Sequence, residues 1–517
     1  MGKLPLPALT DRFDRWLPAL ATCALVLHAL APIADSDVPM HAAVGRYMVQ
    51  HRALLPTPDP LVWTDHGGDQ PHEWMAQAVI GMVADGGGLG ALRPLLAVVA
   101  ALCGWILLRI ARMHGLRPHG VALLVLAWTV AVAPHLAMRP HVFGWMAALA
   151  VLGLGVGDPQ PWSGRAAVGW LALVALWANL HASVLIAPVY ALLAGVDLAW
   201  QQRRDLANLR WQQPALRVAV CGAGALCQPM GWRLLPYVAQ SQAINGALSD
   251  EWQPLLQADV LGNQPLVLWV WAVAAVAAVA AWRQVAWPGA ISATCAVVHA
   301  AATRRMTVFL FVPVLAGLTA LGSQANSALR WTARLATLGA IGAASVSLAG
   351  WVHRPALDRS AYPQQAAAFL KLTDLHGRLF NPDPWGGYLS WVLDGRQRVF
   401  LDGRWLLAGR QTVADGIALQ ARQGETRPLF AHYGLEIFVQ RSADFAAVPP
   451  PDPAQWSLAW QDPLAVVLVA RGRNWAANRA QICDFYQQYP ALTEHGHWPT
   501  QGRAVLPAAQ DDCRAAQ

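Results

Sequence analysis

The feature that most limits how this chain can fold is its series of long stretches without charged side chains. Charged residues make up 13% of the chain and hydrophobic residues 56%, whereas an ordinary soluble domain carries about 25% charged residues. A membrane-spanning helix needs about 20 mostly apolar residues. We therefore predict a polytopic α-helical membrane protein with about eleven spans, at residues 17–33, 91–108, 119–135, 141–157, 166–180, 183–200, 218–230, 265–282, 286–302, 306–322 and 332–351.

The distribution of basic residues predicts the orientation of these spans. With the N-terminus in the cytoplasm, the cytoplasmic side carries more Lys and Arg than the outer loops before residue 352, as the positive-inside rule requires. The first apolar run is long enough to span and lacks a small-residue cleavage site, so we expect no cleaved signal peptide. The net charge of +7 comes largely from the cytoplasmic arginines, and it does not indicate a nucleic-acid partner.

Two domains are expected. Residues 1–352 form the membrane domain, with long outer loops at 34–90 and 231–264, and residues 353–517 form a soluble α/β domain on the outer side. Smaller expected elements are a surface helix at 74–88, a helix at 362–372, strands at 377–381, 398–402, 435–440 and 465–470, and a stiff loop at 449–453. Cys483 and Cys513 lie in the outer domain, where an oxidising compartment would let them pair.

The first outer loop carries the main candidates for catalysis. Asp35 and Asp37 follow the first apolar run directly, and His41, His72 and Glu73 lie further along the loop. A carboxylate suits the role of a general base at neutral pH. The alternative is that Asp35 and Asp37 only cap the next helix, as Asp often does.

Arginines at the outer ends of spans are candidates for binding an anion. Arg139, Arg304 and Arg305 stand there against the positive-inside bias, and a guanidinium group can bind phosphate through two parallel hydrogen bonds. The alternative is a side chain that extends to the lipid head groups. His181 ends a span and Glu251 lies in the second long loop. Each is a candidate for the cavity, or else an ordinary interfacial or surface residue.

The outer domain carries two further candidate segments. Trp385 and Tyr388 belong to the stretch 381–388, which is rich in turn-forming residues, while Asp402 and Arg404 follow a predicted strand. Loops that follow strands often carry binding residues. The alternatives are plain turn chemistry, in which Asp and Gly serve the backbone, and docking against the membrane domain.

Taken together, these segments occur in an order that resembles the GT-C superfamily of polytopic glycosyltransferases. The likeness is to bacterial members that are related to protein O-mannosyltransferases and aminoarabinose transferases and have a periplasmic C-terminal domain. The segments that carry it are Asp35-Ser-Asp37, His41, Gly45, Asp59-Pro60, His72-Glu73-Trp74, Arg139-Pro140, Trp177-x-Asn179-x-His181, Glu251-Trp252, Trp385-Gly-Gly-Tyr388 and Asp402-Gly-Arg404.

The resemblance implies an inverting transfer of a sugar from a polyprenyl-phosphate-linked donor to a lipid, glycan or protein acceptor. The reaction would take place at the outer face of the bacterial inner membrane, with a cytoplasmic N-terminus and a periplasmic C-terminal domain. Asp35 or Asp37 would be the general base. The expected phosphate-binding residues are Arg139, Arg304 and Arg305, and those shaping the cavity or the acceptor site are His41, His72, Glu73, His181 and Glu251.

No cofactor is certain from this resemblance. Some relatives use a divalent cation, so Mg²⁺ or Mn²⁺ held by Asp35, Asp37 and Glu251 stays open, since Mg²⁺ prefers oxygen ligands.

Two other functions are compatible with the sequence. A lipid or glycan transporter or flippase would carry ionisable residues near the membrane midplane and often repeated halves, whereas here these residues gather at the outer ends of spans. A non-catalytic envelope assembly protein is the second alternative. It is favoured by departures from the family pattern, such as Gln228 in Gln228-Pro-Met-Gly231, where Asn is expected.

Overall fold

The computed structural model describes residues 12–67, 72–158, 160–204, 211–257, 263–283, 289–321, 327–421, 426–447, 453–489 and 513. The chain divides into two compact units. The first contains residues 1–32, 72–76 and 91–354, and the second contains residues 33–71, 77–90 and 355–517. The second unit therefore combines much of the predicted first outer loop with the C-terminal sequence.

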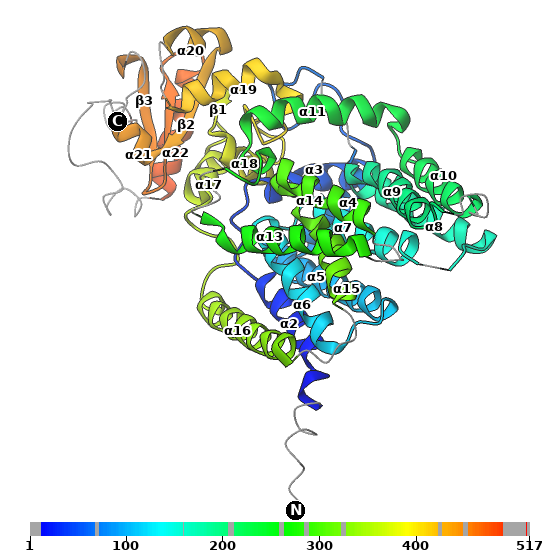
Figure 1. The fold of residues 1–517 in the computed structure, drawn as a ribbon. Coiled ribbons are helices and arrows are strands. Elements are labelled where there is room, and N and C mark those ends of the chain that lie inside the picture. Colours follow the sequence, from blue (N-terminus) through cyan, green and yellow to red (C-terminus); the bar gives the residue numbers. More distant parts are fainter. Residues whose placement is uncertain are drawn as a thin grey trace, which may run out of the picture. The chain divides into compact units, whose positions relative to one another are not determined.

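The first unit is built from helices (Figure 1). They are α2 (Leu17–His28), α5 (Leu92–Met113), α6 (Pro118–Val132), α7 (Pro140–Ala148) continued by a π-helical stretch (Leu149–Val156), α8 (Gly164–Leu180), α9 (Ile186–Gln201), α10 (Gln212–Leu226), α11 (Leu234–Leu248), α13 (Pro265–Ala280), α14 (Ala290–Ala302), a 3₁₀ stretch (Arg304–Leu310), α15 (Phe311–Ala320) and α16 (Ser327–Val352). Helix α4 (Trp74–Gly87) begins in this unit and continues in the second.

Within the described residues, four helical segments are long and apolar enough to cross a membrane: Leu89–Met113, Pro118–His135, Ala182–Gln201 and Ser327–Val352. Each contains one of the predicted spans. Four shorter apolar helices, Pro140–Val156, Gly164–Leu180, Pro265–Ala280 and Ala290–Ala302, coincide with four more. The predicted spans 17–33, 218–230 and 306–322 correspond to α2, α10 and the segment from Arg304 to α15. The count of eleven spans therefore stays a prediction.

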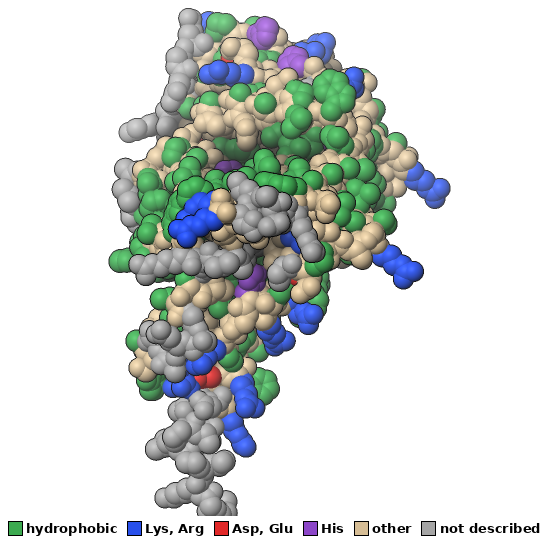
Figure 2. Space-filling view, turned by 45° about the vertical axis from the view of Figure 1, so that its right-hand side comes forward, with side chains coloured by type: hydrophobic (Ala, Val, Ile, Leu, Met, Phe, Trp, Pro, Cys, Tyr) green, Lys and Arg blue, Asp and Glu red, His purple; other side chains and the backbone are tan. Residues whose placement is uncertain are grey.

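Apolar side chains on the surface of the first unit fit a lipid environment. Helix α13 exposes Trp269 and Val276, and α16 exposes Leu335 and Val346. Figure 2 shows apolar side chains over much of the face it draws, broken by separate groups of Lys and Arg. Soluble monomeric proteins rarely expose large contiguous apolar patches, so contact with lipid is the simplest account of these helices.

A buried aspartate fixes the start of α14. The Asp197 carboxylate on α9 accepts the backbone N–H groups of Ile291 at 2.9 Å and of Ser292 at 3.0 Å. The first N–H groups of a helix have no partner within the helix, and here a side chain from another helix supplies one. A Cβ atom at Gly289 would collide with this carboxylate. Asp197 therefore anchors the helix that leads into Arg304 and Arg305.

The second unit contains a four-stranded mixed sheet with helices (Figure 1). The strands β1 (Arg378–Phe380), β2 (Leu435–Arg441), β3 (Trp456–Gln461) and β4 (Ala465–Ala470) lie in the order β1-β2-β4-β3. Strand β1 is parallel to β2, and the other neighbours are antiparallel. The helices are α3 (Asp37–His51), most of α4, α17 (Gln364–Thr373), α18 (Asp383–Leu393), α19 (Trp405–Ala421), α20 (Arg427–Tyr433), α21 (Ser442–Ala447) and α22 (Trp475–Gln488).

Three of the predicted strands form, and one does not. Residues 398–402 stay outside the sheet because Val399 pairs with the first outer loop instead: its N–H donates to the Leu61 carbonyl at 2.8 Å, and its carbonyl accepts from Trp63 N–H at 3.0 Å. Strand β3 was not predicted. Most of the predicted loop at 449–453 lies outside the described residues. A disulfide joins Cys483 and Cys513, whose Cα atoms are 5.5 Å apart.

The segment 381–388 was expected to be a loop, but from Asp383 onward it belongs to helix α18. Pro384 lies in the first turn and Asp383 begins the helix, and both residues favour a helix start. Two glycines then let α18 pack closely. A Cβ atom at Gly386 would collide with the Leu401 carbonyl, and one at Gly387 would lie 2.8 Å from the Ser36 carbonyl oxygen and the Met40 Cβ. Gly386 therefore lets α18 approach the backbone at Leu401, and Gly387 lets it pack on α3, so neither glycine serves a turn.

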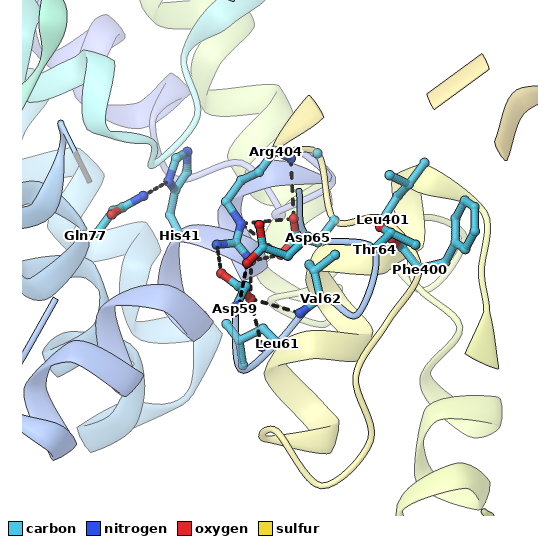
Figure 3. Close-up of polar contacts among 12 residues, drawn as sticks. His41, Asp59, Leu61, Val62, Thr64, Asp65, Gln77, Phe400, Leu401 and Arg404 are labelled. Atoms are coloured by element: carbon cyan, nitrogen blue, oxygen red, sulfur yellow. Dashed lines mark hydrogen bonds and ion pairs between the residues drawn. The ribbon is translucent and has the colours of Figure 1, made fainter. Parts of the chain in front are cut away.

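A buried ion triad of Asp59, Asp402 and Arg404 ties the first outer loop to the C-terminal sequence within this unit, and Figure 3 labels Asp59 and Arg404. The Arg404 guanidinium donates to the Asp59 carboxylate at 2.6 and 3.1 Å and to the Asp402 carboxylate at 2.7, 3.0 and 3.1 Å. The three side chains are only 6%, 3% and 1% exposed. Burial lowers the pKa of Arg404, but the two carboxylates raise it well above its ordinary value. Arg404 therefore stays protonated.

Removing the cation of this triad should destabilise the second unit. Arg404→Met leaves two buried carboxylates without their partner, which costs about 3–5 kcal/mol when a buried ion pair is broken. We expect the unfolding midpoint of the purified full-length protein, followed by tryptophan fluorescence, to fall by roughly 10 °C. Arg410→Met removes an exposed arginine of the same unit and should leave the midpoint unchanged. Equal midpoints for the two variants would contradict a stabilising triad.

Candidate functional site

The first unit brings two of the three predicted phosphate-binding arginines onto one carboxylate. The Arg139 Nη2 donates to Glu251 Oε2 at 2.8 Å, and the Arg305 Nε lies 3.6 Å from the same oxygen. The Arg139 side chain is 7% exposed, whereas those of Arg305 and Glu251 are 24% and 30% exposed. Arg139 is thus buried, while Arg305 and Glu251 are partly accessible to solvent.

Local sequence explains how these side chains reach one another. Pro140 is the first residue of α7, and a residue before proline is driven into extended conformation. Arg139 has that conformation and turns away from the helix. Glu251 lies in a 3₁₀ turn, Asp250–Trp252, and the Arg305 guanidinium centre lies 5.2 Å from the centre of the Trp252 ring. The three residues come from segments more than fifty residues apart, so no local motif marks their contact.

The electrostatics of this cluster keep Glu251 ionised. Burial raises the pKa of the Glu251 carboxyl, but the Arg139 and Arg305 guanidinium groups outweigh burial and hold this pKa at about 2. A carboxylate with such a low pKa is a poor proton acceptor at neutral pH. Glu251 acts here as the counter-ion of two arginines.

Arg304 has a different environment from its neighbour. Its side chain donates to the Gln257 Oε1 at 3.0 Å and to the Pro254 carbonyl at 3.4 Å, and its backbone N–H donates to the Gln253 carbonyl at 3.2 Å. The residue is buried. These contacts hold the loop that carries Glu251, so Arg304 supports the cluster through the backbone.

A second acidic group of the first unit gathers Glu73 with two histidines. The Glu73 Oε1 lies 3.2 Å from His72 Nε2 and 3.3 Å from His181 Nε2. His181 Nδ1 accepts the Ser183 N–H at 3.0 Å, so its Nε2 carries the proton and donates to Glu73. Burial lowers the pKa of His181 to about 4, and the Glu73 carboxylate opposes this without overcoming it. His181 is therefore a neutral hydrogen-bond donor at pH 7.

Sequence reasoning missed two histidines that join these groups. Arg139 Nε donates to His141 Nδ1 at 3.4 Å, and His141 Nε2 lies 2.8 Å from the His135 carbonyl. The His135 Nδ1 lies 4.0 Å from Glu251, and the rings of His141 and His181 lie 6.4 Å apart. The pattern Arg139-Pro-His141 was the available signal for one of them. The cluster therefore extends from Glu73 to Glu251 by way of His181, His141 and Arg139.

In the second unit, Asp35 and Asp37 lie at the start of α3 and have different contacts. The Asp35 Oδ1 accepts the Asp37 N–H at 3.0 Å, so Asp35 provides a partner for the first N–H group of α3, although Ser36 is the residue at the N-cap. The Asp37 side chain accepts from the Ser36 hydroxyl at 3.4 Å and lies against Gly403, where a Cβ atom would stand 2.9 Å from Asp37 Oδ1. Gly403 has φ +90°, so two constraints require glycine beside this carboxylate.

The loop that follows Leu401 also contacts Asp383. The Asp383 Oδ1 accepts the Gly403 N–H at 3.2 Å. Burial raises the pKa of the Asp383 carboxyl to about 6, and the Asp402 carboxylate adds to the rise against the lowering effect of hydrogen bonds. Sequence reasoning included Asp383 in a turn-rich segment without assigning it a role.

The remaining candidates of the second unit take part in its packing. His41 is buried and its Nδ1 lies 3.2 Å from the Gln77 Nε2 (Figure 3). Trp385 and Tyr388 are buried on α18, and the Tyr388 ring lies 5.0 Å from that of Tyr362, whose hydroxyl donates to the Asp35 carbonyl at 2.6 Å. Asp402 and Arg404 belong to the ion triad. These residues position the Asp35–Asp37 turn.

The residues suggested for a divalent cation are divided between the units: Asp35 and Asp37 lie in the second and Glu251 in the first. Across the described part of the chain, no group of three or more His, Cys, Asp or Glu side chains is arranged to hold a metal ion.

Comparison with known proteins identifies the fold. No protein-family model matches the chain, and no curated protein matches it in sequence. Solved structures do match. The oligosaccharyltransferase of Archaeoglobus fulgidus superposes with a TM-score of 0.52 in the apo form, at 10% identity over 82% of this chain and 69% of that chain. Its complex with zinc and sulfate gives 0.53 at 11% identity, over 82% and 68%.

A bacterial structure gives a similar score over nearly its whole length. ArnT from Cupriavidus metallidurans bound to undecaprenyl phosphate superposes with a TM-score of 0.51 at 14% identity, over 88% of this chain and 97% of that chain. Both structures have the fold of GT-C glycosyltransferases, so the likeness confirms, at the level of the fold, the resemblance seen in the ordered sequence segments. The chain therefore has the fold of the GT-C superfamily of membrane glycosyltransferases.

Proposed function

We propose that the chain is a glycosyltransferase that moves a sugar from a polyprenyl-phosphate-linked donor to a lipid, glycan or protein acceptor. The reaction takes place at the outer face of the bacterial inner membrane. The observation that carries this proposal is the group formed by Arg139, Arg305 and Glu251 in a chain with a GT-C fold. The undecaprenyl phosphate bound in the ArnT structure supports a lipid phosphate as the ligand.

Two guanidinium groups on one side of a carboxylate suit a departing phosphate. When the bond between sugar and phosphate breaks, negative charge grows on the phosphate oxygens, and preorganised cations stabilise that charge most in the transition state. Arg139 and Arg305 supply these cations. Glu251 neutralises them while no ligand is bound. Because the pKa of Glu251 is about 2, its carboxylate stays ionised between pH 5 and 8. The phosphate therefore displaces an ionised Glu251 by competing for the two arginines, and protonation of Glu251 plays no part.

The proposed general base is Asp37. In an inverting transfer the acceptor oxygen attacks the anomeric carbon opposite the leaving phosphate, and a carboxylate takes the acceptor proton. Asp35 already accepts the Asp37 N–H, so we assign it the positioning of Asp37. Glu73, with His72 and His181, is proposed to hold acceptor hydroxyl groups. His41 supports the Asp37 helix through its contact with Gln77.

Lipid-phosphate binding tests the arginine assignment directly. Native mass spectrometry of the purified full-length protein with added undecaprenyl phosphate should show binding that weakens roughly 10- to 100-fold in Arg139→Ala and in Arg305→Ala, because each loses a charge-assisted hydrogen bond. Glu251→Gln should bind more tightly than the wild type, since a competing carboxylate is gone. Arg233→Ala removes an exposed arginine of the same unit and is the control. Wild-type affinity in both arginine variants would overturn the assignment.

Release of polyprenyl phosphate tests the base without knowledge of the sugar. Membranes that supply donor and acceptor should release it roughly 10²- to 10⁴-fold more slowly with Asp37→Asn, because a general base contributes about that factor. Lipid binding by this variant should stay at the wild-type level. Asp35→Asn should lose less activity, since an amide oxygen can still accept the Asp37 N–H. An Asp37→Asn protein with full transfer activity would rule out Asp37 while leaving the phosphate site standing.

A further inference from the structure

The second unit contains a cavity that the proposed reaction does not use. Its volume is about 600 Å³, within the range of about 300–1,000 Å³ that small-molecule sites occupy. It lies where β2 begins and β4 ends, and helix α20 forms part of its wall. None of the residues assigned above to phosphate, base or acceptor lines it.

The charge of this cavity favours an anion. Arg378, Arg427, Arg471 and Arg473 line it, and Glu436 is the one acidic residue that does so among the described residues, which leaves a formal charge of +3. The four arginines come from β1, from the start of α20 and from the turn after β4. Three of these arginines, Arg378, Arg427 and Arg473, are exposed to solvent, so an anion can reach their guanidinium groups, and the summed positive charge attracts it.

Contacts within the unit hold two of these arginines in place. The Arg378 Nη1 donates to the Tyr433 carbonyl at 3.0 Å, and its guanidinium centre lies 5.1 Å from the centre of the Trp63 ring. The Arg471 guanidinium lies 5.2 Å from the centre of the Trp475 ring. A guanidinium has five N–H donors, so Arg378, which donates to one carbonyl and lies over one ring, keeps donors for a ligand. These contacts preorganise Arg378 and Arg471.

Polar and aromatic groups complete the wall. Glu436 accepts from the Asn474 side chain at 3.1 Å and from Arg473 at 3.3 Å, which orients its carboxylate at the cavity. Phe430 and Trp456 also line it, with ring centres 5.6 Å apart. Apolar rings beside a few oriented polar groups are typical of pockets for organic ligands. A pyranose ring with an acidic group matches these features: the sugar contacts the small exposed parts of Phe430 and Trp456, which are 9% and 6% exposed, its hydroxyl groups bond the polar side chains, and the acid meets the arginines.

We propose that this cavity binds an acidic saccharide, with a carboxylate or a phosphate as the anionic group. The choice of a saccharide rests on the proposed sugar transfer, whereas the preference for an anion rests on the cavity itself. Binding here recruits an acidic glycan to the second unit, and the ligand is recognised mainly by its charge.

Calorimetry on the full-length protein in nanodiscs, without donor lipid, tests this proposal. The probes are a tetramer of galacturonic acid, glucose 6-phosphate, the neutral maltotetraose and inorganic phosphate. We expect at least one of the two acidic sugars to bind, more tightly than inorganic phosphate, and the neutral sugar not to bind. Tight binding of the galacturonate tetramer identifies a carboxylate ligand, and tight binding of glucose 6-phosphate identifies a phosphorylated ligand. Affinity should fall as salt is raised, because exposed charges are screened.

Matched variants locate the site. Arg427→Ala and Arg378→Ala should each weaken binding at least fivefold, while Arg410→Ala, an exposed arginine outside the cavity, should bind as the wild type. All three should keep wild-type affinity for undecaprenyl phosphate, so failure here is separable from failure of the phosphate site. Three results would overturn the proposal: no acidic sugar binds, inorganic phosphate binds as tightly as the acidic sugars, or Arg410→Ala weakens binding as much as Arg378→Ala.

Discussion

The second unit depends on the burial of Arg404 between Asp59 and Asp402. An isolated ion in such surroundings would cost several kcal/mol, and only close carboxylates with good geometry offset that cost. Asp59 also accepts the N–H groups of Leu61 and Val62 at 2.8 and 2.9 Å, so the triad fixes the backbone of the first outer loop as well as its side chains. One ion cluster thus joins chain segments that are 345 residues apart and sets the loop beside which Asp37 lies.

In the first unit, two arginines are also neutralised by a carboxylate, but this group is more exposed to solvent. Glu251 neutralises Arg139 and Arg305, but its side chain is 30% exposed while those of the triad are almost fully buried. If one member of a buried triad left its partners, a charge would stay buried without compensation. A partly exposed carboxylate can leave its arginines for water when another anion arrives. The difference in exposure separates ions that hold structure from ions suited to binding a ligand.

Much of the architecture followed from apolar length alone, while most of the long-range contacts did not. The apolar runs predicted helices, and three strands of the second unit formed at segments with a strand pattern. Turn-forming residues misled the prediction at 381–388: Gly386 and Gly387 look like loop residues, yet they lie in a helix that packs closely on α3. Residues 398–402 have a strand pattern, but their hydrogen bonds go to Leu61 and Trp63. The tertiary partner decided both cases.

The candidate residues show the same limit. Arg139, Glu251 and Arg305 were singled out separately, from charge at the ends of spans, and their pairing required the folded chain. Asp402 and Arg404 were expected to bind a ligand, to form a turn or to dock against the membrane domain. The structure shows them buried with Asp59, and a binding role stays a prediction. His135 and His141 carried little signal because a histidine in an apolar helix is usually a packed residue. What distinguishes them is a partner: His141 lies between Arg139 and the His135 carbonyl. In a chain this poor in charge, burying a polar group without a partner is costly, so the contacts of these histidines indicate more about their role than their positions in the sequence do.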